Sequence, residues 1–146
     1  MTKHILSVVA FLIVSFAAQG LSHFVINAEH FAAVTFMRAE PIIPLGLFVM
    51  VLQGAMLSLA LQAWRGGSAK VADGLSVACL FGAFLVSYIA IVEPSKYVVP
   101  SILDWFLVEA SVGAVQFAVF GVVLGAIHHR FAGNRVGKRD ELRGQT

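Results

Sequence analysis

The sequence predicts an all-α fold, an integral membrane four-helix bundle with both termini in the cytoplasm. Three observations predict it. The composition is 59% hydrophobic and only 12% charged, whereas a soluble domain is nearer half apolar and a quarter charged. The apolar residues gather in four long segments. The basic residues lie almost entirely on one side of those segments.

The four apolar segments cover residues 5–26, 42–64, 71–92 and 102–127. A hydrocarbon core needs about 20 residues of helix, and each segment reaches that length. Together they hold 93 of the 146 residues, which leaves no room for a separate soluble domain. We therefore predict one transmembrane domain, residues 1–129, followed by a basic cytoplasmic tail, residues 130–146.

The distribution of charge predicts the orientation. If the segments alternate in direction, eight of the ten Lys and Arg residues lie on one side, and only Arg38 and Lys96 lie on the other. The positive-inside rule then places both termini in the cytoplasm, and we expect a bacterial inner (plasma) membrane. The net charge of +2 thus reflects topology and not nucleic-acid binding.

The first segment carries a polar stripe. Ser15, Gln19, His23 and Asn27 recur every fourth residue and His30 follows at the next turn, so all five share one helix face. Polar groups are costly in lipid, so this face is expected to turn toward the other helices.

A secretory signal is an alternative interpretation of the N-terminus. Lys3 precedes the apolar run, and residues 15–17 resemble a small-residue cleavage pattern. The run continues to residue 26, which is long for a signal core. Cleavage would leave three helices in the same orientation, so charge counting does not decide between the two interpretations.

The connections and small residues predict how the helices pack. Residues 27–41 are apolar for a loop and are expected to lie at the interface or fold back over the bundle. The turn at residues 65–70 is short, so the second and third segments run antiparallel. In the second segment Gly46, Gly54 and Ser58 allow a neighbour to approach closely. Helix contacts are also predicted at Gly74, Ala78, Gly82, Gly113, Gly121 and Gly125.

Several polar side chains should meet in the outer half of the bundle, where we predict a pocket for protons or a ligand. Its candidate residues are His23, Glu109, Gln19, Gln53, Asn27, Tyr88 and Gln116. Residues 5–16 contain no titratable group, so the half nearer the cytoplasm is expected to be dry.

Glu109 has two interpretations of about equal weight. It is either a proton acceptor paired with His23, or a neutral side chain hydrogen-bonded to Gln19 or Gln53 that fixes the helix register.

The histidines raise the question of metal or haem ligation. His23 and His30 share one helix face, whereas His4, His128 and His129 all lie at the cytoplasmic end, where they could meet. No facing histidine lies in the second or third segment. We favour histidines satisfied by water and neighbouring groups over a metal site.

Motifs for catalysis are missing from the sequence. Cys79 is the single cysteine, which excludes an intramolecular disulfide, a CxxC pair and a cysteine zinc cluster. No phosphate loop, HExxH motif or nucleophile–base arrangement is present. The sequence leaves any cofactor unknown.

The expected function is that of an accessory or assembly subunit, which acts through helix–helix contacts in a larger complex or homo-oligomer. Its expected partners are the lipid bilayer and other membrane subunits. The alternative is a proton-coupled permease, or an enzyme acting on a lipophilic substrate, that uses His23 and Glu109.

Overall fold

The computed structural model describes the backbone of residues 1–38 and 40–143, and the side chains of residues 1–38 and 40–132. Within this part the chain forms helices and no strand. Four helical stretches, Thr2–Ile26, Ile43–Arg65, Val71–Lys96 and Ile102–Ala132, are long and apolar enough to cross a membrane. The prediction of an all-α chain with four long apolar helices is therefore confirmed.

Two of the long helices change character near their ends. After α1 (Thr2–Leu21) comes a π-helical turn, η1 (Ser22–Ile26), and then the short α2 (Ala28–Ala32). After α4 (Val71–Ser87) comes a second π-helical turn, η2 (Tyr88–Val92), and then the short α5 (Glu93–Lys96). The other two helices are α3 (Ile43–Arg65) and α6 (Ile102–Arg143).

The helix ends follow from local chemistry. Pro44 lies in the first turn of α3, where its missing N–H costs nothing. Gly66 ends α3 with a φ of 58°, a conformation that glycine adopts without strain. At the start of α6 the Asp104 N–H donates to Ser101 Oγ over 3.2 Å. α6 continues to Arg143, beyond the end at residue 127 that hydropathy predicts.

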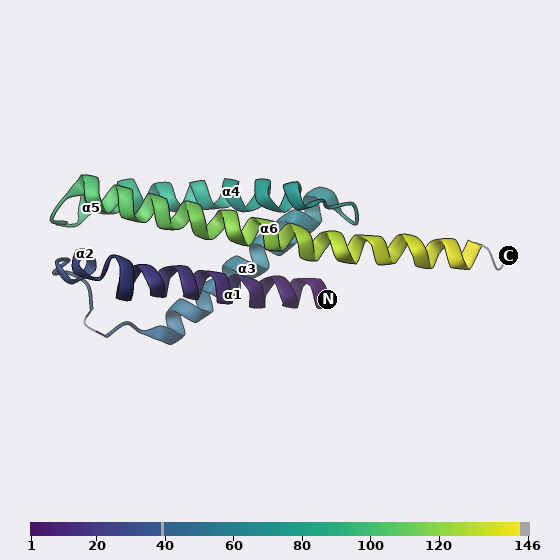
Figure 1. Cartoon of the computed structure of the whole chain (residues 1–146), viewed down its shortest axis with the longest axis horizontal. Coiled ribbons are helices and arrows are strands. Elements are labelled where there is room, and N and C mark those ends of the chain that lie inside the picture. Colours follow the sequence, from purple (N-terminus) through teal and green to yellow (C-terminus); the bar gives the residue numbers. More distant parts are fainter. Residues whose placement is uncertain (39, 144–146) are drawn as a thin grey trace.

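Figure 1 shows how the helices are arranged. α4 lies alongside α6, α1 lies on another side of α6, and α3 crosses α1 obliquely. α2 and α5 lie at one end of the bundle, here called the α2/α5 end. The start of α1 and the connection from α3 to α4 lie at the opposite end, here called the turn end.

Glycines bring α4 and α6 into backbone contact, as their spacing predicts. A methyl group at Gly74 would overlap the backbone of Gly125, and one at Gly121 would lie 2.8 Å from the Cα atom of Leu75. At Gly82 and Gly113 an added methyl group would overlap the side chain of a facing residue. Small residues at a helix crossing permit this approach. The predicted contact residues on these two helices therefore serve packing within the chain.

A layer of apolar side chains fills the middle of the bundle. Phe11 of α1 meets Phe120 of α6 edge to face, with ring centroids 4.8 Å apart, and both side chains are fully buried. Phe117 and Leu124 extend the layer along α6. On both helices this layer separates the polar side chains of the α2/α5 end from those of the turn end.

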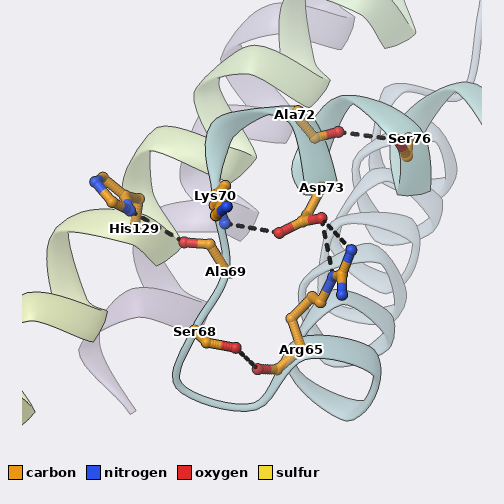
Figure 2. Close-up of polar contacts among 8 residues, drawn as sticks. All are labelled: Arg65, Ser68, Ala69, Lys70, Ala72, Asp73, Ser76 and His129. Carbon is orange, nitrogen blue, oxygen red and sulfur yellow. Dashed lines mark hydrogen bonds and ion pairs between the residues drawn. The ribbon is translucent and has the colours of Figure 1, made fainter.

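The connection from α3 to α4 is held by polar contacts around one carboxylate (Figure 2). Arg65 donates to Asp73 Oδ1 through Nε over 2.9 Å and through Nη2 over 2.8 Å. The Lys70 N–H donates to Asp73 Oδ2 over 2.8 Å, which caps the first turn of α4. His129 Nδ1 donates to the Ala69 carbonyl over 3.1 Å and so ties this connection to α6. These contacts hold the turn at which the chain reverses direction, as predicted, although α4 then packs mainly on α6 and touches α3 little.

Candidate functional site

Polar side chains gather at two levels of the bundle, on either side of the apolar layer. Near the α2/α5 end, Ser15, Gln19 and Gln116 form the glutamine cluster. Near the turn end, His4, Ser58 and His128 form the histidine cluster. The sequence predicts the first cluster in part. It also indicates that His4 and His128 could meet at one end, as they do with ring centroids 5.7 Å apart, but it does not predict Ser58 between them.

The glutamine cluster joins α1 to α6. Gln19 Nε2 donates to Gln116 Oε1 over 2.8 Å, and Gln116 Nε2 donates to Ser15 Oγ over 2.9 Å. The Gln116 side chain is 6% exposed, so these bonds replace the water it would have at the surface. Two of the predicted pocket residues, Gln19 and Gln116, are therefore brought together.

His23 lies in η1, one turn beyond Gln19. Its Nδ1 donates to the Gln19 carbonyl over 3.0 Å. Phe31 of α2 stacks on the ring, with centroids 3.7 Å apart and planes 10° apart. Residues 28–32 thus fold back over the bundle, as their apolar composition predicts. π-Helical turns are frequent at functional sites. Their backbone hydrogen bonds join residues five apart, which changes the direction of the side chains that follow.

Aromatic rings and a second π-helical turn complete the α2/α5 end. Trp105 is buried and its Nε1 donates to the Ile89 carbonyl of η2 over 3.0 Å. Its ring lies 6.0 Å from that of His30 and 6.5 Å from that of Phe31. The His30 Nε2 atom is buried without a hydrogen bond among the described residues.

No hydrogen bond or ion pair joins the other predicted pocket residues to one another among the described side chains. Glu109 is half-buried, and no hydrogen bond or ion pair joins it to His23 within the described side chains. Asn27 donates to Ser22 Oγ over 3.0 Å. Tyr88 is exposed, and its hydroxyl accepts a hydrogen bond from Lys96 Nζ over 3.0 Å. The predicted pairing of His23 with Glu109 is thus not supported by a hydrogen bond or an ion pair.

Two of the grooves on the sides of the bundle contain an amide side chain. The α1/α3 groove has a volume of about 330 Å³ and contains Gln19 and His23 among apolar residues. The α3/α4 groove has a volume of about 300 Å³, and Gln53 is the one amide in its lining. Gln53 has no hydrogen bond within the part of the chain whose side chains are described.

The histidine cluster connects three helices through one hydroxyl. Ser58 Oγ of α3 lies 2.8 Å from His4 Nδ1 of α1 and 2.9 Å from His128 Nε2 of α6. A hydroxyl has one hydrogen and two lone pairs, so it can donate to one ring and accept from the other. Ser58 is fully buried and His128 is 2% exposed. The His128 Nδ1 atom has no hydrogen bond among the described residues.

The expectation that the half nearer the turn end is dry is wrong. Lys3 donates to Gln62 Oε1, and Ser7 Oγ donates to the Lys3 carbonyl over 2.8 Å, beside the histidine cluster. The physical reason is that these polar residues are divided among α1, α3 and α6, so no single segment looks strongly polar. A signal did exist, since Ser58 follows Gly54 by four residues and His128 follows Gly125 by three. Both therefore lie on faces that the glycines assign to helix contact.

No metal site emerges from the described side chains. Nowhere among them do three or more His, Cys, Asp or Glu residues come together in a way that could hold a metal ion. The chain matches no known protein family, and no curated protein or solved structure is similar to it. Function must therefore be argued from the two clusters and the two grooves.

Proposed function

We propose that this protein is an integral membrane accessory or assembly subunit, with both termini in the cytoplasm, that binds a transmembrane helix of a partner subunit. The orientation is supported by the excess of Lys and Arg on one side of the four apolar helices. The subunit role is supported by one amide on α3 that has no hydrogen-bond partner among the described side chains.

Gln53 carries this proposal. It lies near the middle of α3, a helix of 23 residues. In hydrocarbon, an amide without a hydrogen bond is costly, and such side chains commonly bond across helices. The rest of the α3/α4 groove is apolar, so it offers Gln53 no alternative acceptor or donor. A partner helix that brings one polar side chain into this groove would satisfy it.

The exposure of α3 is consistent with this role. Only 17% of its most apolar stretch is buried, against 39% for α6. The glycine faces of α4 and α6 are filled within the chain, so they do not supply the contact surface. The surface for a partner is therefore the face of α3 around Gln53 and not the small-residue motifs of α4 and α6.

The test is copurification in mild detergent with matched variants. Gln53→Met keeps the length of the side chain and removes the amide, whereas Gln53→Asn keeps an amide. Interhelical hydrogen bonds in membranes contribute about 0.6–2 kcal/mol, so Gln53→Met should weaken association about 3- to 30-fold. The thermal stability of the isolated protein should stay unchanged, because Gln53 makes no hydrogen bond within the described chain.

Gln53→Asn should retain part of the association. A second copy of this chain as the partner would appear as a dimer that Gln53→Met weakens. Protein that is monomeric with nothing bound, or association that is equal in both variants, would contradict the proposal.

The alternative functions, a proton-coupled permease or an enzyme on a lipophilic substrate, have less support. They rely on His23 and Glu109, between which no hydrogen bond or ion pair forms among the described side chains. The layer around Phe11 and Phe120 also separates the two polar clusters. Glu109→Gln should therefore leave growth and the uptake of protons into vesicles unchanged.

A further inference from the structure

The α1/α3 groove at the α2/α5 end has the volume of a small-molecule site, and His23 in its lining has a ring nitrogen without a hydrogen bond among the described residues. We propose that it binds a single-chain lipophilic alcohol or phenol, whose hydroxyl donates to His23 Nε2. This site is independent of the proposed subunit role, because Gln53 lines the other groove.

The size and lining of the groove fit such a ligand. Its volume of about 330 Å³ is at the lower end of the range for small-molecule sites, about 300–1,000 Å³. Such sites are mostly apolar and have a few placed polar groups. Here Phe16 and Phe24 of the α1 side face Leu47 and Met50 of α3, and only Gln19 and His23 are polar.

The chemistry of His23 selects a donor. Nδ1 lies 3.0 Å from a carbonyl oxygen, which can only accept, so Nδ1 carries the hydrogen. In the neutral ring Nε2 is then an acceptor. Nε2 has no hydrogen bond among the described residues. The buried side-chain atoms without a hydrogen bond do not include it, so it is not fully buried. Nε2 is therefore accessible, and Phe31 stacked on the ring holds its plane.

Two glycines leave the groove open. Gly54, Gly74, Gly82, Gly113, Gly121 and Gly125 each have a neighbour where a side chain would begin. Gly20 of α1 and Gly46 of α3 have none within 4 Å, and both line this groove. Packing within the chain does not require them to be glycine. We expect the proposed ligand to occupy the space beside these two glycines.

The acceptor distinguishes this ligand from bulk lipid. An acyl chain brings no hydrogen-bond donor, so it would fill the groove without satisfying Nε2. An alcohol with one long chain supplies both the apolar body and the donor. The preference should therefore disappear when the hydroxyl is converted to an ether.

The experiment uses photo-crosslinking of the purified full-length protein in phospholipid nanodiscs. The probes are 1-hexadecanol with a diazirine on its chain and the methyl ether of the same molecule. We expect the alcohol to label peptides containing residues 16–24 and 41–50, about tenfold more than the ether does, since one net hydrogen bond corresponds to about that factor.

Three variants complete the test. His23→Phe keeps the aromatic stack and removes the acceptor, so it should lower labelling by the alcohol to that by the ether. Gly46→Leu should block both probes, and Gly67→Leu, at a glycine with open space in the α3–α4 connection, should change neither. Helix content and melting check that each variant folds. A diazirine phospholipid that labels the groove as well as the alcohol, or equal labelling by alcohol and ether, would overturn the proposal.

Discussion

Gly74 and Gly125 face each other across α4 and α6 with no room for a methyl group between them. This contact continues at Gly121, so the two helices meet through backbone and not through long side chains. Such close approach increases van der Waals contact between helices, which is the main source of helix association in lipid. The first prediction follows from this geometry.

Gly74→Ala should destabilise the protein even though alanine is the better helix former. Forcing a methyl group into a packed interface costs about 1–3 kcal/mol, whereas the change in helix propensity returns at most about 1 kcal/mol. Thermal melting in detergent, followed by circular dichroism, would measure the difference. The matched control is Gly46→Ala, where the added methyl group meets nothing, and which should leave Tm unchanged or raise it. Equal effects of the two substitutions would contradict the packing described for α4 and α6.

Ser58→Ala should destabilise the junction of three helices at the turn end. The substitution removes the hydroxyl that lies within hydrogen-bond distance of His4 and His128 and leaves a buried imidazole nitrogen unsatisfied. Such a loss costs about 1–3 kcal/mol. Unfolding in a denaturing detergent would measure it. Ser76→Ala is the control, because Ser76 is exposed and bonds only to the Ala72 carbonyl of its own helix. A Ser58→Ala variant as stable as this control would argue against a structural role for the histidine cluster.

Asp73 combines two interactions that can be separated by substitution. Asp73→Asn keeps an acceptor for the Lys70 N–H and removes the ion pair, whereas Asp73→Ala removes both. The Arg65 side chain is 43% exposed, so its ion pair contributes little. Asp73→Asn should therefore lower Tm by roughly half or less of the loss seen for Asp73→Ala. Raising the salt concentration should remove most of the difference between Asp73→Asn and the parent protein. The reverse order of the two variants would mean that the ion pair dominates.

The predicted topology can be tested by labelling single cysteines in a Cys79→Ala background. Val98→Cys lies in the exposed connection between α5 and α6, at 87% exposure, and Gly67→Cys lies in the connection between α3 and α4. A maleimide that does not cross membranes should label Val98→Cys in intact cells and Gly67→Cys only after permeabilisation. Labelling in the opposite order would invert the orientation that the charges predict.

The sequence was informative wherever one segment carried the whole signal. The length of each apolar run predicted the four long helices, and the spacing of Gly74, Gly121 and Gly125 predicted the faces that meet. The fourfold spacing of Ser15 and Gln19 also predicted the face of α1 that bonds to Gln116. Periodicity within one helix reports which face is buried, so these features needed no knowledge of the neighbours.

Features that depend on how helices cross could not be predicted in the same way. Ser58 looks like a small packing residue in the sequence, and only the crossing of α3 over α1 beside α6 makes it a bridge between His4 and His128. The sequence predicts both His23 and Glu109 in the outer half of the bundle, yet depth does not specify rotation about the helix axis. The π-helical turns at Ser22–Ile26 and Tyr88–Val92 shift that rotation further, and hydropathy carries no signal for them.

The contacts of α6 also bear on the order in which the chain can assemble during its synthesis. The crossing of α1 and α3 involves only helices from the first half of the chain, so it can form early. α4 touches α3 little and packs mainly on α6, which is synthesised after it. The glycine face of α4 therefore stays without its complement until translation has delivered α6.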